Sequence, residues 1–388
     1  MPAGREPTLV VYQFRLPEVT HFGWGAVEGV GQEAARLGRR ALLVTGRAAM
    51  KQTGTADRVV ALLAAAGLSV LPYEGIESDP RAATIDRAAK AARAEGCDLV
   101  VGLGGGSPMD AARAIAAMAV LEGSITDYLD GKAIDRPGLP LINIATTAGT
   151  ASEITSVAVV LHERKQLKMG LKSPFWFARV AITDPELTLT MPPALTAATG
   201  LDALTHAIES YVSTQATPPS EGLALRAIEL VGLHLRAAFA DGSNRPAREG
   251  MALASMTAGM AFANSGLGLV HGLVHPIGAR FGVPHGMACG RLLPLVMRYN
   301  QPAAEEKMAQ VGRALTRRPE AAAGDAADAV ESLLRDLGVP AGIGDVGVPA
   351  DQIPSLARDG LLAGAVRTNP RPVTEQEALA LLEEARER

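Results

Sequence analysis

The chain has 388 residues, of which 48% are hydrophobic and 20% are charged; this composition is ordinary for a globular protein, and the length predicts two or three domains. The net charge of −4 and the isoelectric point near 6.0 argue against nucleic acid as the main partner, and no apolar run reaches the ~20 residues of a membrane span. We expect no signal peptide, because the N-terminus lacks a long apolar core. The two cysteines form neither a disulfide framework nor a CxxC zinc motif, which fits a reducing, cytoplasmic setting.

The first half of the chain alternates between strand-like and helix-like segments. Strands are expected at 9–15, 39–46, 68–76 and 97–106, twice within 139–160 and again after 179; helices are expected up to Gly38, near 57–66, at 85–96 and at 104–120. Alternation of this kind predicts βαβ units and a parallel sheet. The apolar runs ALLV and LVVGL are typical of strands buried on both faces. We therefore expect an α/β, Rossmann-like dinucleotide-binding domain.

Two turns of this domain carry small residues that suit a cofactor. The run GGGSPMD enters a helix whose first turn contains Ser107 and Asp110, and glycines at a helix N-terminus let backbone N–H groups approach a phosphate. The run TTAGTAS places hydroxyl groups at Thr146, Thr147 and Thr150. GGGSPMD matches neither standard nucleotide motif. A plain strand–helix turn and a solvated loop with local hydroxyl–backbone bonds therefore stay open as alternatives.

The pair Pro192–Pro193 is the predicted domain boundary, which divides the chain into residues 1–192 and 193–388. Beyond it the patterns are almost entirely helical, with helices expected at 194–213, 219–240, 246–265, 268–281, 302–316, 321–337 and 374–387. TPPSEG and DGSNRPA are typical of interhelical turns. The second domain is therefore expected to be all-helical.

The strongest chemical pattern lies in this helical half. One acidic residue and four histidines stand at helical spacing or just after a Gly/Pro-containing turn: Asp202, His206, His271, His275 and His285. The first two are four residues apart, as are the third and fourth, so each pair shares a helix face and can point into one cavity. One carboxylate with several imidazoles suits a divalent first-row metal such as iron or zinc. The alternative is an ordinary polar helix face.

Together these segments resemble the iron-containing (group III) alcohol dehydrogenases along nearly the whole chain, and most closely the lactaldehyde/propanediol and butanol dehydrogenase-like members. The matching runs are FGWGA, GGGSPMD, TTAGTASE, DPELTLTMPP, ATGLDALTHAIESY, GLGLVHGLVHPIGARFGVPHG and NPRP. The resemblance implies a Rossmann-like domain followed by an all-α, dehydroquinate synthase-like metal-binding domain. It also implies an NAD(P)-dependent enzyme that interconverts small primary alcohols and aldehydes and uses Fe²⁺, with Zn²⁺ as the substitute.

The resemblance further implies roles for individual residues. The metal ligands would be Asp202, His206, His271 and His285, and His271 would be catalytic together with His275, a proton relay or nicotinamide contact. The cofactor would be bound by Asp79, Gly105, Gly106, Ser107, Thr146, Thr147, Thr150, Lys168 and Leu187. Phe262 would line the substrate pocket, with Val157 and Ala365 nearby.

The expected chemistry agrees with this set, because a divalent metal acts as a Lewis acid on the substrate oxygen while the nicotinamide carries the hydride. Three alternatives remain: a lyase resembling dehydroquinate synthase, a maleylacetate reductase-like enzyme, and a non-enzymatic metal-dependent binding protein. The first would need basic phosphate-binding residues that the metal segment lacks, and the second departs from the four-ligand pattern that is present here.

The end of the second strand bears on cofactor choice. An acidic residue there normally binds the adenosine ribose and repels a 2′-phosphate, but this chain has Gly46, followed by Arg47 and, one turn further, Lys51. A guanidinium can pair with the phosphate, so we predict that NADP(H) is accepted and preferred, with NAD(H) still usable. The alternative is that Gly46 only ends the strand and Arg47 is solvated.

Substrate and assembly are also predicted. The small apolar side chains of Val157 and Ala365 favour short, unbranched primary alcohols and aldehydes over vicinal diols. No nucleic-acid or membrane partner is expected. The strand expected at 9–15 would leave an open sheet edge, and the resemblance suggests a homodimer through the N-terminal domains, or a higher homo-oligomer.

Overall fold

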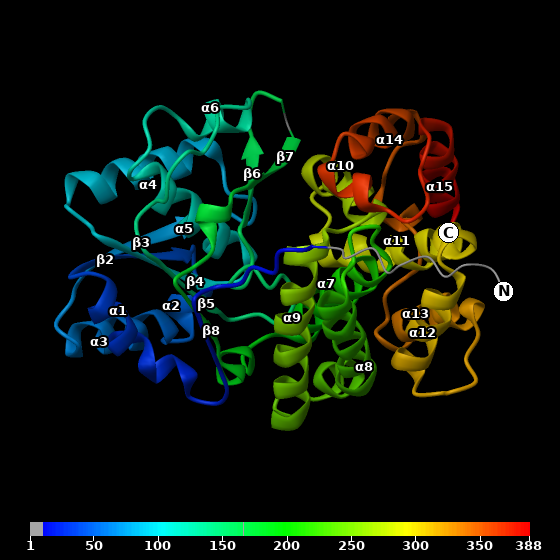
Figure 1. Cartoon of the computed structure of the whole chain (residues 1–388), viewed down its shortest axis with the longest axis horizontal. Coiled ribbons are helices and arrows are strands. Elements are labelled where there is room, and N and C mark those ends of the chain that lie inside the picture. The colour runs from blue at the N-terminus through cyan, green and yellow to red at the C-terminus, as the bar shows by residue number, and fades with distance from the viewer. Residues whose placement is uncertain (1–10, 166) are drawn as a thin grey trace.

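Figure 1 shows an α/β domain, formed by the first half of the chain, beside a helical domain formed by the second. The structure is a computed structural model and describes residues 11–165 and 167–388. The parallel sheet followed by a helical domain confirms the fold class expected from the sequence. Helix α7 begins at Pro193, and the domain boundary at Pro192–Pro193 stays a prediction.

The sheet of the first domain contains six parallel strands in the order β1-β8-β5-β4-β2-β3. These strands are β1 (Val19–Phe22), β2 (Arg40–Gly46), β3 (Ser69–Ile76), β4 (Leu99–Gly104), β5 (Leu141–Ala145) and β8 (Val180–Thr183). Every residue of β4 and β5 is buried, which explains why their sequences are continuous apolar runs. A separate antiparallel pair consists of β6 (Val157–His162) and β7 (Leu167–Lys172).

Helices cover both faces of the large sheet, as Figure 1 shows. They are α1 (Val30–Leu37), α2 (Ala49–Gln52), α3 (Thr55–Ala65), α4 (Ala82–Ala94), α5 (Gly106–Met118) and α6 (Ile125–Leu129), with short 3₁₀ turns η1 (Ala26–Gly29), η2 (Pro174–Trp176) and η3 (Pro185–Thr188). Val59 and Leu63 of α3 pack on one face of the sheet, whereas Ile85 of α4 and Ile115 of α5 pack on the other. The strand-to-helix turns therefore gather at the carboxyl edge of the sheet.

The second domain is a bundle of helices around one core. The helices are α7 (Pro193–Val212), α8 (Pro218–Ala240), α9 (Arg245–Ser265), α10 (Leu269–Phe281), α11 (His285–Asn300), α12 (Glu305–Thr316), α13 (Ala323–Asp336), α14 (Ile353–Leu361) and α15 (Glu375–Glu387). Short 3₁₀ turns lie between them at η4 (Gln301–Ala303), η5 (Gly344–Val346), η6 (Ala350–Gln352) and η7 (Gly364–Thr368). The core combines apolar residues of several helices, among them Leu204, Val231 and Leu292.

No single helix among the described residues is long and apolar enough to cross a membrane. Helices α9 and α10 meet that length and composition only when they are taken together, and they are bent by 106° at the break between them.

The first strand differs from the expectation. The described part of the segment expected as a strand, residues 11–15, has no regular structure, and residues 9 and 10 lie outside the described residues. The sheet instead begins with β1, which pairs with β8 as an edge strand. Val11 is 93% exposed, so the apolar pattern of this segment does not reflect burial within this chain.

Helix α11 was not predicted from the sequence, because glycines interrupt the helical pattern of residues 285–300. They allow close approach to α7: a Cβ on Gly286 would lie 2.0 Å from the carbonyl oxygen of Ala198, and one on Gly290 would lie 2.7 Å from the Leu201 side chain. Residues that are weak helix formers in isolation are therefore needed here for packing. This close contact brings His285, the first residue of α11, next to α7. Helix α14 and strand β7 were also not expected.

One buried arginine ties the Gly-rich helix to the hydroxyl-rich loop. Arg113 of α5 is 1% exposed and donates hydrogen bonds to Oδ1 of Asp110 at 3.0 Å and to the carbonyl of Thr155 at 2.9 Å. Asp110 also accepts from Oγ of Ser152 at 2.5 Å and from the N–H of Val159 at 2.9 Å. Asp110 is therefore more than a favourable charge in the first helical turn, because it bridges α5 to the loop that precedes β6.

We predict that Asp110→Ala lowers the free energy of unfolding by about 3–5 kcal/mol, because it leaves the buried Arg113 guanidinium without its carboxylate. Chemical denaturation would measure the shift. The matched control is Asp135→Ala, which removes an exposed ion pair 3.5 Å long with Arg136 and should change stability by less than about 1 kcal/mol. Equal shifts for the two variants would contradict the prediction.

Candidate metal and cofactor site

Three helices bring the four predicted metal ligands together. They are Asp202 and His206 on α7, His271 on α10 and His285 at the start of α11. Oδ1 of Asp202 lies 3.7 Å from Nε2 of His206, 3.8 Å from that of His271 and 3.7 Å from that of His285. Figure 1 shows the three helices α7, α10 and α11 that carry these four groups.

The cluster is buried and contains an acceptor without a partner. Asp202 is 2% exposed, and its Oδ1 accepts no hydrogen bond from the described residues. Burial by itself raises the pKa of Asp202, but the neighbouring imidazoles outweigh burial and hold the pKa of this carboxyl below its ordinary value. Burial lowers the pKa of both His206 and His285 to about 4, so both rings are neutral at pH 7. A buried carboxylate that faces the neutral imidazole nitrogens of His206 and His285 fits a divalent cation.

Glu209 holds the ring of His271 in place. Its Oε2 lies 2.5 Å from Nδ1 of His271, and its Oε1 accepts a hydrogen bond from the N–H of Val270 at 2.6 Å. Nδ1 therefore carries the proton and donates to the carboxylate, which leaves Nε2 free to face Asp202. Carboxylates orient metal-binding histidines in this way.

Two further predicted residues lie beside the cluster. The ring of His275 is 5.6 Å from that of His285, between centroids. Burial is the main cause that lowers the pKa of His275 well below its ordinary value, so this ring is neutral at pH 7.

Phe262 of α9 stacks on the ring of His206 with centroids 4.4 Å apart. It therefore forms an apolar wall directly against one of the predicted ligands.

The two turns proposed for the cofactor face each other at the carboxyl ends of β4 and β5. A Cβ on Gly106 would lie 2.9 Å from the side chain of Thr150, and one on Gly105 would lie 3.4 Å from that of Thr147. The N–H of Thr146 donates to the carbonyl of Gly104 at 2.9 Å. Ligands of open α/β sheets bind outside the carboxyl ends of the strands. The structure thus brings the Gly-rich and hydroxyl-rich turns together where a dinucleotide would be expected.

Three other predicted cofactor residues already have partners in the protein. Nζ of Lys168 pairs with Oδ1 of Asp79 at 2.7 Å, and the hydroxyl of Ser107 donates to the carbonyl of Ser78. These bonds join α5 and β7 to the loop that follows β3. Leu187 lies in η3 and packs in the core between the sheet and α3, together with Val59 and Leu63.

The end of β2 is open, as the cofactor hypothesis requires. A Cβ on Gly46 would make only ordinary contacts, at 3.7 Å from Pro108 and 3.9 Å from the carbonyl oxygen of Ile76. Arg47 is exposed and makes neither a hydrogen bond nor an ion pair within the described parts of the chain. Lys51 instead pairs with Asp57 at 2.7 Å, so Arg47 is the better partner for a phosphate.

Two family models match the chain: the iron-containing alcohol dehydrogenases over residues 17–185, and the C-terminal domain of the Fe-containing alcohol dehydrogenase family over residues 196–386. The chain belongs to the iron-containing alcohol dehydrogenase family. It is therefore an oxidoreductase, and the family's dependence on a metal agrees with the buried cluster on α7, α10 and α11.

Named relatives support this assignment. The 1,3-propanediol dehydrogenase of Klebsiella pneumoniae is 39% identical over 97% of this chain and 99% of that protein. The NAD-dependent methanol dehydrogenase of Bacillus methanolicus is 35% identical over 96% of this chain and 99% of that protein. The crystal structure of a 1,3-propanediol oxidoreductase has a TM-score of 0.94 at 37% identity, covering 97% of this chain and 100% of that chain.

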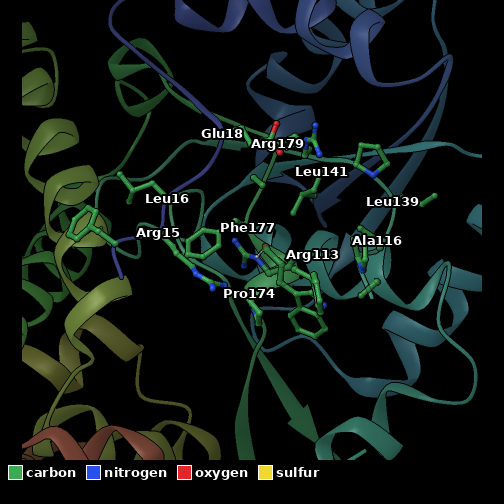
Figure 2. A pocket seen from close by; sticks show the side chains of 18 residues that line it. Arg15, Leu16, Glu18, Arg113, Ala116, Leu139, Leu141, Pro174, Phe177 and Arg179 are labelled. Atoms are coloured by element: carbon green, nitrogen blue, oxygen red, sulfur yellow. Dashed lines mark hydrogen bonds and ion pairs between the residues drawn. The ribbon is translucent and has the colours of Figure 1, made fainter. Parts of the chain in front are cut away.

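A separate cavity of about 590 Å³ lies at the opposite edge of the sheet. Figure 2 shows that Glu18 and Arg179, which pair at 2.9 Å, line it together with Leu141 and Arg113. This is the amino-terminal end of β5 and β8, whereas dinucleotides bind at the carboxyl ends of strands. The cavity is therefore not the expected cofactor site of this alcohol dehydrogenase.

The predicted substrate residues come from two separate elements. Val157 begins β6 and pairs with Lys172 of β7; a Cβ built on Gly170 of the same strand would lie 3.5 Å from its side chain. Ala365 lies in η7, which contacts α10 through Val366. No hydrogen bond or ring contact among the described residues joins either one to the histidines, so their role stays a prediction.

Two residues that contact the predicted metal ligands were not predicted from the sequence. Glu209 stands three residues after His206 and therefore on the same side of α7. Cys289 stands four residues after His285 on α11, and its Sγ lies 3.6 Å from Nε2 of that histidine. Helical spacing would have found both, but the second required a helix that was not expected.

We predict that Glu209→Gln weakens metal binding about 10–100-fold, the usual effect of removing a carboxylate that orients a ligand. His271 and Val270 donate to different oxygens of the Glu209 carboxylate, and a glutamine replaces one of these acceptors with an NH₂ donor. Competition with a metal-binding dye would measure the affinity. Glu229→Gln, which removes an exposed pair with Arg226, serves as control; equal affinities for the two variants would contradict the role of Glu209.

Proposed function

We propose that this enzyme interconverts small primary alcohols and aldehydes with NADP(H) or NAD(H), and that Asp202, His206, His271 and His285 hold its metal ion. The observation that carries the proposal is the buried Oδ1 of Asp202, which has three imidazole nitrogens within 3.8 Å and no hydrogen-bond partner among the described residues. The relatives reported above are alcohol and diol dehydrogenases, which favours this activity over a lyase or a maleylacetate reductase.

The roles of the residues follow from their geometry. A bound divalent cation supplies Lewis acidity at the substrate oxygen, and the nicotinamide exchanges the hydride. Glu209 keeps the proton of His271 on Nδ1. The apolar ring of Phe262 stacks on one face of the His206 ring. His275, neutral and half-buried beside His285, is placed to pass the hydroxyl proton of the alcohol towards solvent.

The substrate preference proposed here is for short, unbranched chains, because Phe262, Val157 and Ala365 offer apolar surfaces only. Such surfaces discriminate weakly, by ~1–3 kcal/mol per group. A kinetic panel of short aldehydes and alcohols with both cofactors tests this preference, and a markedly higher kcat/KM for propane-1,2-diol than for butan-1-ol would contradict it.

We further propose a cytoplasmic homodimer or higher oligomer that forms through the N-terminal domains. The exposed apolar side chains of Val11 and Phe175 and the edge position of β1 support such contact. Light scattering that finds a stable monomer at micromolar concentration would contradict this assembly.

We predict that His271→Ala removes bound metal and NAD(P)H-dependent aldehyde reduction while the protein stays folded, because the cluster loses one of its buried nitrogen donors. Elemental analysis measures the metal, circular dichroism the fold, and chelation of the wild type should reproduce the loss of activity. His21→Ala is the control, since His21 pairs with Glu33 on the first domain. A His271→Ala protein with stoichiometric metal would refute the proposed site.

We predict that wild type prefers NADP(H) and that Arg47→Ala lowers kcat/KM for NADP(H) about 10–100-fold, since hydrogen bonds to charged groups contribute ~1.5–3 kcal/mol. Gly46→Asp should shift preference to NAD(H) by repelling the 2′-phosphate, and the space at Gly46 admits the side chain. Gly46→Ala is the uncharged control. A wild type that favours NAD(H) by more than about tenfold, a difference of ~1.4 kcal/mol, would overturn this assignment.

A further inference from the structure

A sulfur atom lies against the metal cluster. Cys289 of α11 is completely buried, and its Sγ lies 3.6 Å from Nε2 of His285 and 4.0 Å from Nε2 of His271. One donor atom each from Asp202, His271, His285 and Cys289 lies within 4.8 Å of all the others. Sulfur is therefore part of the same constellation as the nitrogen and oxygen donors.

The spacing of these atoms suits a single coordination shell. Bonds of ~2.3 Å to sulfur and ~2.0–2.1 Å to nitrogen place two donors of one metal ion ~3.1–3.8 Å apart when the angle between them is ~90–120°, as in a five-coordinate site. The observed separations of 3.6 and 4.0 Å lie within or close to this range. Oδ1 of Asp202, buried and without a hydrogen-bond partner among the described residues, completes the set.

The side on which Cys289 lies leaves the site accessible. The side chain of His285 is 33% exposed, whereas those of Asp202 and His271 are each 3% exposed. The opening of the cluster is therefore at His285, and Cys289 approaches from the protein interior. A sulfur ligand in this position leaves the open side for a substrate oxygen.

We propose that Cys289 is a fifth donor to the metal, a sulfur ligand beside Asp202, His206, His271 and His285, and that it raises the affinity of the site for zinc relative to ferrous iron. The inference rests on the proposed metal centre. On binding, the thiol proton passes to water and a sulfur–metal bond forms, without any change of oxidation state. Soft thiolate ligands favour zinc, whereas nitrogen and oxygen donors alone do not distinguish the two ions in this way.

Cobalt(II) provides a direct test, because thiolate ligation produces a near-ultraviolet sulfur-to-cobalt charge-transfer band. Metal-free full-length protein is titrated with Co²⁺ as wild type, Cys289→Ser and Cys97→Ser. The band is expected in wild type and in Cys97→Ser, whose altered cysteine belongs to the core of the first domain, and it should be absent from Cys289→Ser. Competition between Zn²⁺ and Fe²⁺, followed by elemental analysis, should show that Cys289→Ser reduces the zinc preference about tenfold.

X-ray absorption at the zinc edge of the Zn²⁺-loaded wild type supplies a second measurement that does not depend on the serine variant. A sulfur neighbour at ~2.3 Å from the zinc is expected, and a shell of nitrogen and oxygen alone would contradict the sulfur ligand. Wild type that takes up one Co²⁺ without the band, or a zinc preference unchanged in Cys289→Ser, would overturn the sulfur ligand while leaving the proposed metal centre intact. Wild type that takes up no Co²⁺ and no Zn²⁺ would overturn both.

Discussion

The buried carboxylate of Asp202 is the constraint on which the rest of the active region depends. An ionised carboxylate in a protein interior is unfavourable unless a positive charge or several donors compensate it. Two of the surrounding imidazoles, those of His206 and His285, are neutral at pH 7 and supply lone pairs rather than charge. A cation would compensate the charge of the Asp202 carboxylate and would also accept the imidazole lone pairs. The packing of α7, α10 and α11 around Asp202 is therefore that expected of a metal centre. Glu209 is a second buried carboxylate, and hydrogen bonds from His271 and Val270 stabilise its charge.

The α/β domain meets a different requirement, which is to hold two turns of small residues in a fixed arrangement. A Gly-rich turn and a loop of small hydroxyl residues have little packing of their own, yet they face each other closely. The buried Arg113 and its partner Asp110 supply the missing order, because they bind several groups of the loop from the side of α5. The predicted cofactor contacts are thus placed by a polar network within the core, while hydrophobic packing on both faces holds the sheet itself.

The sequence predicted those parts of the fold that depend on local patterns. Buried parallel strands are apolar throughout, and the long helices of the second domain follow a regular periodicity, so both were recognised. Helix α11 was missed because Gly286 and Gly290 argue against a helix locally, while in the fold they allow contact with α7. The opposite error occurred at residues 11–15, where β-like residues pair with no strand among the described residues.

The same distinction applies to the site. Sequence alone determined that Asp202 and His206 share a helix face and that a glycine ends β2 beside an arginine, because spacing along one element is a local property. Only the tertiary structure decided that one oxygen of Asp202 meets imidazoles from three helices, and that Glu209 and Cys289 contact two of those imidazoles. Distances between elements are set by how side chains and glycines interlock across helix interfaces, and no pattern within a single segment records that packing.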